Sequence, residues 1–231
     1  MRPKPSLRLL PAAALALLAG LAPATARPVV VELFTSQSCS SCPPAEALIG
    51  ALAGEGGDVL PLAYHVTYWN HLDWRDTYSL PAATERQNAY AKRLDGQVYT
   101  PQTVIDGQTG LVGSQEAAVR AAIAAAKAGC GEAVPVTLAR EGGLRVRLGA
   151  GEGSGTVTLV GFDPSHVTSV ARGENAGRTI KQANVVRSVA EIGRWSGAAR
   201  EWTLPWPAGE AAAVIVQDGA GRVIGAARTG G

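Results

Sequence analysis

The sequence predicts an α/β domain followed by a smaller all-β domain built as a β-sandwich. Helix and strand signals alternate from residue 27 to about residue 127, and short β-like runs separated by glycine follow from residue 134. Alternating signals favour a sheet covered by helices, whereas evenly spaced short strands favour a sandwich. The boundary is expected near residues 129–133. This places one domain over residues 27–130 and the other over residues 131–231.

The first 26 residues have the pattern of a secretory signal peptide. Three basic side chains precede an apolar run over residues 9–21, and Ala24 and Ala26 supply the small-residue pattern of a cleavage site. The run is too short to span a bilayer, and an uncleaved membrane anchor is the alternative. We therefore expect cleavage after Ala26 and a mature protein that is soluble and periplasmic or secreted.

The composition is that of an ordinary globular protein, with 46% hydrophobic and 17% charged residues. The leader carries three of the 21 basic residues, so the mature chain keeps 18 against 19 acidic ones, a formal charge of −1. No basic run or stripe is left in the mature sequence. This distribution argues against nucleic acid or anionic lipid as a partner.

The first elements of the α/β domain flank the cysteines. A buried strand is expected over residues 28–34, which form a nearly continuous apolar run. Pro43 and Pro44 fit only the first turn of a helix, where their missing N–H groups cost little, so a helix should cover residues 43–53. A second strand is expected over residues 59–66, and an aromatic segment over residues 67–81 follows it.

The remaining elements of this domain complete the alternation. A helix with a capping threonine at its start is expected over residues 84–94. A strand over residues 102–105 is followed by an Asp-Gly turn, which predicts a hairpin with residues 111–113. An alanine-rich helix capped by Ser114 should then cover the sheet.

The second domain is expected to consist of strands alone. Each candidate strand is a short run rich in β-branched or apolar residues, bounded by glycine. The expected strands cover residues 136–139, 144–148, 156–162, 185–192, 213–217 and 223–226.

Cys39 and Cys42 are separated by two serines where the first strand gives way to the first helix. In an oxidising compartment two such close thiols are expected to form a disulfide. A cysteine at a helix N-terminus meets unpaired N–H groups and the positive end of the dipole, which favour thiolate. Cys39 would therefore attack, and Cys42 would resolve the mixed disulfide. An inert structural disulfide is the alternative.

Thr100-Pro101 lies after the second helix and directly before a predicted strand. A proline entering a strand there indicates a cis bond, and an ordinary trans proline is the alternative. With the cysteine pair, the order of elements over residues 27–128 resembles the thioredoxin superfamily. The resemblance implies a thioredoxin-like domain in which Thr100 and Pro101 face the cysteines and dock the backbone of a partner protein.

The sequence motifs around the cysteines indicate a more specific family. VELFTSQ over residues 31–37 and CSSCPPA over residues 39–45 resemble a secreted bacterial thioredoxin-like family of unknown function. RGEN over residues 172–175 and NVVR over residues 184–187 are similar to the same family, so the resemblance covers nearly the whole mature chain. Ser38 departs from the glycine expected before the first cysteine.

Glu32 lies on the strand that leads to the cysteine pair, where thioredoxins carry a buried acid. One interpretation is a carboxyl whose pKa is raised by burial and which serves as acid or base for Cys42. The other is an edge or salt-bridged glutamate without a chemical role.

Two histidines offer an alternative use of the cysteines. Cu(I) prefers soft thiolate ligands, so Cys39 and Cys42 could hold copper with His65 or His71. A histidine among aromatic residues is more often packed or hydrogen-bonded than a ligand. Structural zinc is disfavoured because the cysteines and histidines lack the spacing of a four-ligand site. No cofactor is predicted.

Two further features have a plain and a functional interpretation. Cys130 is an odd cysteine, either buried near the domain boundary or engaged in a regulatory or intermolecular disulfide. A polar cluster in the second domain indicates a solvated loop held by internal salt bridges, with anion or protein binding as the alternative. Its members are Arg172, Glu174, Asn175, Arg178 and Arg187.

The sequence therefore favours an exported thiol-disulfide oxidoreductase that exchanges with a protein thiol or disulfide of unknown identity. A membrane redox partner that renews the pair is a further candidate. The alternatives are a copper-binding chaperone and a non-catalytic binding or scaffold protein with a structural disulfide.

Overall fold

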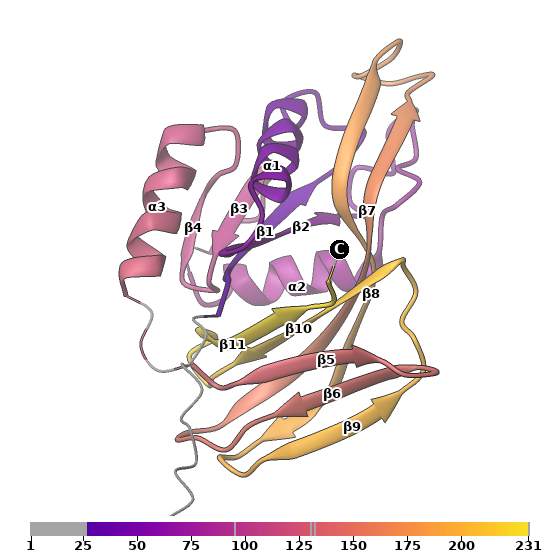
Figure 1. The fold of residues 1–231 in the computed structure, drawn as a ribbon. Coiled ribbons are helices and arrows are strands. Elements are labelled where there is room, and N and C mark those ends of the chain that lie inside the picture. Colours follow the sequence, from indigo (N-terminus) through magenta and orange to yellow (C-terminus); the bar gives the residue numbers. More distant parts are fainter. Residues whose placement is uncertain (1–26, 95, 130, 132, 231) are drawn as a thin grey trace, which may run out of the picture.

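The computed structural model describes residues 27–94, 96–129, 131 and 133–230 (Figure 1). The predicted signal peptide and Cys130 lie outside these residues. The first half of the chain alternates between strands and helices. Its elements are β1 (Val29–Thr35), α1 (Pro43–Glu55), β2 (Val59–His65), α2 (Pro81–Ala91), β3 (Gln102–Ile105), β4 (Thr109–Val112) and α3 (Glu116–Ala128).

The second half consists of strands, two of which are much longer than expected. β7 has 15 residues and β8 has 17. The strands of this half are β5 (Val136–Arg140), β6 (Leu144–Leu148), β7 (Gly155–Ser169), β8 (Thr179–Trp195), β9 (Arg200–Leu204), β10 (Ala211–Gln217) and β11 (Val223–Arg228).

One sheet runs through both halves of the molecule. Its eight strands follow the order β11-β10-β7-β8-β2-β1-β3-β4, and β5, β6 and β9 form a separate three-stranded sheet. β8 joins β2 in parallel at Ala63 and Val185. The side-chain amide of Asn184 donates to the Pro61 carbonyl at 2.7 Å, which strengthens this junction. The strand order is therefore mixed and continuous, and a separate β-sandwich is not shown.

Strand β1 separates two cores, because its side chains alternate between the faces of the sheet. Val31 and Leu33 pack with α1 and α3, whereas Val30 and Phe34 pack on the face covered by α2. A third core fills the space between the small sheet and the strands of the second half. Trp195 is its largest buried side chain.

The start of α2 differs from the sequence-based expectation. The helix begins at Pro81, with Leu80 as its N-cap, and not at Thr84. Proline is favoured at the first helical position because its missing N–H would have no partner there. The Thr84 hydroxyl instead accepts a hydrogen bond from the Thr67 N–H at 2.9 Å, which ties the aromatic segment to α2.

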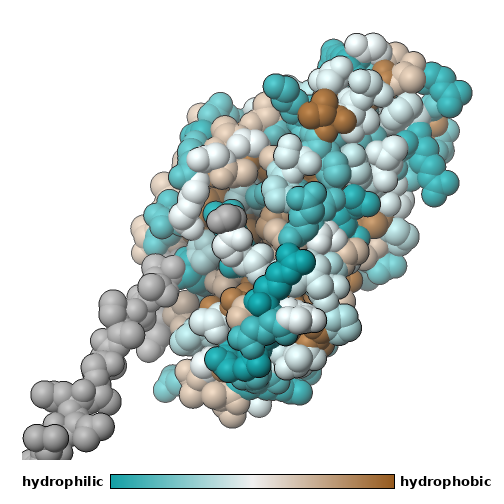
Figure 2. All heavy atoms as spheres, turned by 45° about the vertical axis from the view of Figure 1, so that its right-hand side comes forward, coloured by the Kyte–Doolittle hydropathy of each residue, from teal (hydrophilic) through white to brown (hydrophobic). Residues whose placement is uncertain are grey.

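Beyond Phe162, β7 and β8 leave β10 and continue as a two-stranded ribbon over residues 163–185, which rises beside α1 (Figure 1). The ribbon ends in a turn over residues 170–178. Figure 2 shows a face of the molecule on which hydrophilic residues predominate and hydrophobic ones are scattered. Within the described residues, no helix is long and apolar enough to cross a membrane.

Candidate functional site

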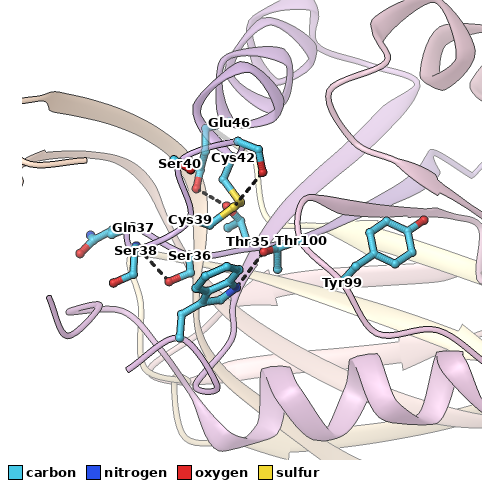
Figure 3. Close-up of a disulfide and its surroundings, with 12 residues drawn as sticks. Thr35, Ser36, Gln37, Ser38, Cys39, Ser40, Cys42, Glu46, Tyr99 and Thr100 are labelled. Atoms are coloured by element: carbon cyan, nitrogen blue, oxygen red, sulfur yellow. Dashed lines mark hydrogen bonds between the residues drawn. A yellow bond between two sulfur atoms is a disulfide. The ribbon is translucent and has the colours of Figure 1, made fainter. Parts of the chain in front are cut away.

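Cys39 and Cys42 form a disulfide at the start of α1, with their Cα atoms 5.4 Å apart (Figure 3). Cys42 is the N-cap of the helix, and Pro43 and Pro44 occupy its first turn, as predicted. The Cys42 N–H donates to the Cys39 carbonyl at 3.2 Å, so Cys39 lies just before the helix. Both cysteines are only 1% exposed, although the two serines between them are exposed.

The loop that leads to Cys39 is held by the segment after β2. The Gln37 N–H donates to the Asp76 carboxylate at 2.7 Å. The Ser38 hydroxyl donates to the Trp74 carbonyl at 2.5 Å. Ser38 is buried, so the serine that replaces the expected glycine fastens this loop to the aromatic segment.

A buried polar group lies beside the disulfide on the α1 face of the sheet. The Thr35 hydroxyl donates to Glu46 Oε1 at 2.8 Å, and both residues are seen next to the cysteines in Figure 3. His65 Nε2 lies 3.8 Å from the same carboxylate oxygen. Glu46 Oε2 is buried and has no hydrogen-bond partner among the described residues. The Gln182 side chain also stabilises the Glu46 carboxylate, because it lowers the pKa of this group.

Burial and neighbouring charges shift the pKa values of this group. Burial raises the pKa of Glu46, since it penalises the carboxylate more than His65 and Thr35 stabilise it. Burial alone would lower the pKa of His65, but the Asp76 and Glu46 carboxylates together outweigh it and the pKa is raised. The pKa of Asp76 is lowered although burial opposes this, because His65 Nδ1 lies 2.7 Å away. His65 and Asp76 therefore form a buried hydrogen-bonded pair behind Glu46.

The peptide bond between Thr100 and Pro101 is cis, as predicted. Thr100 lies beside the disulfide in Figure 3, although the two segments are far apart in the sequence. The Trp69 indole N–H donates to the Thr100 hydroxyl at 2.8 Å. The aromatic segment after β2 thus contacts both the loop before Cys39 and the loop before Pro101.

The turn of the β7–β8 ribbon directly contacts the cysteine loop, which is the segment between β1 and α1, residues 36–42. The side-chain amide of Asn175 donates to the carbonyls of Gln37 and Cys39, each at 2.9 Å. The Glu174 carboxylate accepts from the Ser40 N–H at 3.1 Å. Asn175 is completely buried, so the interpretation of this cluster as a solvated loop is wrong for Asn175. The only sequence signal for this contact was the polar, glycine-containing turn itself.

Glu32 has a different place from the one expected for an acid serving Cys42. Its side chain lies on the α2 face of the sheet, whereas α1 covers the opposite face. Its carboxylate accepts hydrogen bonds from the Arg86 guanidinium at 2.5 and 3.0 Å and from the Tyr90 hydroxyl. Glu32 is therefore a buried ion-pair residue, and this placement gives no support to an acid or base role on Cys42.

The four residues of the alternative copper set are not brought together. His65 Nδ1 is bonded to Asp76, and His71 is an exposed residue whose Nδ1 bonds the Tyr68 carbonyl at 2.7 Å. The part of the chain that the structure describes contains no group of three histidine, cysteine or acidic residues placed to hold a metal ion. The geometry therefore gives the copper alternative no support.

Comparison with known proteins places the chain in a family. The model of a family described as a protein of unknown function, DUF1223, matches residues 30–217. The chain belongs to the DUF1223 family. No curated protein matches it.

Two solved structures are similar to this DUF1223 protein. One is a crystal structure of an Agrobacterium tumefaciens protein, 31% identical, with a TM-score of 0.77, covering 88% of this chain and 94% of its own. The other is HBP35 of Porphyromonas gingivalis, 15% identical, with a TM-score of 0.60, covering 88% of this chain and 74% of its own. The second likeness concerns the fold alone.

Proposed function

We propose that this DUF1223 protein is an exported, thioredoxin-like protein that exchanges its Cys39–Cys42 disulfide with a protein thiol or disulfide. The observation that carries this proposal is the disulfide at the start of α1, with Thr100-Pro101 and the Glu46 carboxyl beside it. A helix start supplies N–H donors and a positive dipole end for a thiolate at Cys39. The leader sequence supports export, and an oxidising compartment suits a disulfide.

The exchange moves two electrons in two steps. In the reducing direction, a partner thiolate attacks Cys39 Sγ, a mixed disulfide forms, and the bond to Cys42 breaks, so that Cys42 leaves as a thiolate. A second partner thiolate then attacks the mixed disulfide and releases Cys39 as a thiolate. The partner dithiol is thereby oxidised to a disulfide. In the opposite direction Cys39 attacks a partner disulfide, and Cys42 resolves the mixed disulfide.

Glu46 is the candidate for the proton that accompanies these steps. Its buried Oε2 has no hydrogen-bond partner within the required geometry among the described residues, and burial raises the pKa of the carboxyl. A carboxyl of this kind can take a proton from a thiol or return one to a leaving thiolate. We therefore assign to Glu46 the acid or base role that the sequence suggested for Glu32, because Glu46 lies on the same face of the sheet as the disulfide.

Trapping of mixed disulfides tests the proposal. Cys42→Ser leaves Cys39 without its resolving partner, so complexes between Cys39 and partner proteins should accumulate in cells that export the protein. They should disappear on reduction and should not form in the Cys39→Ser, Cys42→Ser double variant. Non-reducing gels with mass spectrometry identify the partners.

Ser41→Ala is the matched control, because it removes the hydroxyl that lies 3.4 Å from Cys39 Sγ but keeps the resolving Cys42. It should form no stable complexes. If Cys42→Ser is exported and folded but forms no Cys39-dependent complexes, the disulfide is structural and the proposal is rejected.

A further inference from the structure

The turn of the β7–β8 ribbon, residues 170–178, reaches the cysteine loop from more than 130 positions away in the sequence. Three of its hydrogen bonds end within four residues of that loop, on the carbonyls of Gln37 and Cys39 and on the N–H of Ser40. The Cys39 carbonyl also accepts the Cys42 N–H that begins the helix. The turn therefore contacts the backbone on both sides of the attacking sulfur.

The conformation of the turn suits this contact. Gly173 has φ +78°, and a Cβ there would lie 3.2 Å from the Trp74 Cβ, so glycine allows the turn to approach the aromatic segment. The Gly177 N–H donates to the Val170 carbonyl at 2.8 Å, and the Val170 N–H donates to the Arg178 carbonyl at 2.9 Å. These bonds close the turn across its base.

The orientation of the Asn175 amide is fixed by its neighbours. Its oxygen accepts from the Arg178 guanidinium at 3.1 Å, while its NH₂ group faces two carbonyls. The reversed amide would set its oxygen against two carbonyl oxygens and its NH₂ group against a guanidinium. Arg178 thus orients the donors of Asn175 toward the cysteine loop.

These contacts determine how easily a thiolate can reach the sulfur of Cys39. A thiolate must reach Cys39 Sγ to attack it, yet Cys39 is 1% exposed. We propose that Asn175 is a positioning residue of a latch, formed by residues 170–178, that holds the cysteine loop closed over the disulfide. The latch limits attack on Cys39 to thiols whose carrier displaces the turn. The inference rests on the proposed function, and it adds how access to that site is controlled.

Reduction of the oxidised full-length mature protein by dithiothreitol tests the latch. A dithiothreitol thiolate attacks Cys39 Sγ, Cys42 leaves as a thiolate, and the second dithiothreitol thiol closes its ring and releases Cys39. Asn175→Ala should raise the second-order rate constant about tenfold, because two buried hydrogen bonds no longer hold the loop. Acid quenching, alkylation and mass spectrometry follow the reaction.

Two variants in the same turn make the comparison specific. Glu174→Ala removes the single bond to Ser40 and should raise the rate by a smaller factor. Arg172→Lys keeps the positive charge of an exposed residue in the turn and should leave the rate unchanged. The unfolding transition of each variant, measured by circular dichroism, must remain well above the temperature of the assay, so that opening is local. If Asn175 only stabilises the fold, Asn175→Ala should lower the temperature of unfolding without raising the rate of reduction.

Unchanged rates in folded Asn175→Ala and Glu174→Ala would overturn the latch. If Asn175→Ala does not fold, Glu174→Ala decides: a raised rate supports the latch and an unchanged rate overturns it. The result is separable from the proposed function, because dithiothreitol needs no protein partner. Raised rates without trapped partners would leave the latch standing and reject protein disulfide exchange.

Discussion

A chain that ends at residue 130 is expected not to fold cooperatively, although the sequence alone suggests an independent domain there. The core on the α2 face of the sheet takes seven buried apolar side chains from the second half of the chain. Burial of one Val, Ile or Phe contributes about 1.5–3 kcal/mol, and a whole domain is stable by about 5–15 kcal/mol. The residues concerned are Val160, Phe162, Val186, Ala213, Ile215, Val223 and Ala226.

Far-UV circular dichroism and thermal unfolding of the fragment over residues 27–130 measure this effect. The control is the mature chain from residue 27 to residue 231, which should show one cooperative transition. A sharp transition in the fragment would contradict a core shared by both halves of the chain and would favour the two-domain interpretation.

Replacement of Arg86 by methionine is expected to destabilise the protein by about 3–5 kcal/mol. The substitution leaves the Glu32 carboxylate completely buried without its guanidinium partner. Tyr90 still donates to Glu32, but one neutral hydrogen bond does not offset an unpaired buried charge. The side-chain amide oxygen of Gln217, which accepts from Arg86 at 2.9 Å, also loses its donor.

Urea titrations give the free energy of unfolding for Arg86→Met, for Glu32→Leu with Arg86→Met, and for Arg120→Ala. The double variant should regain much of the loss, since an apolar pair can replace a buried ion pair. Arg120 pairs with Glu55 on the surface, so its removal should change stability little. An Arg86→Met variant as stable as the parent would mean that the Arg86–Glu32 pair contributes nothing to the stability of the fold.

The elements around the cysteines were predictable because local sequence signals determine them. Pro43 and Pro44 placed the start of α1, since proline fits only the first turn of a helix. Pro101 indicated a cis bond because it lies at the end of a loop, directly before a strand. Signals of this kind need only neighbouring residues, and both predictions were confirmed.

Contacts between distant segments could not be predicted in the same way. Asn175 meets Cys39 only because β7 and β8 extend as a ribbon beside α1, and no apolar run marks residues 163–169 as a strand. Whether Glu32 lies on the same face of the sheet as the cysteines depends on which side of β1 the helix α1 covers. Glu46, at the start of that helix, carried no signal beyond one acidic residue in the first turn.

The reduction potential of the Cys39–Cys42 pair tests the central proposal most directly. It is measured by equilibrating the folded protein with glutathione buffers at pH 7 and counting free thiols by alkylation. A pair that exchanges with partners should have a potential in the range of known exchange proteins, about −270 to −120 mV. A potential below about −300 mV, typical of structural disulfides, would contradict the proposal.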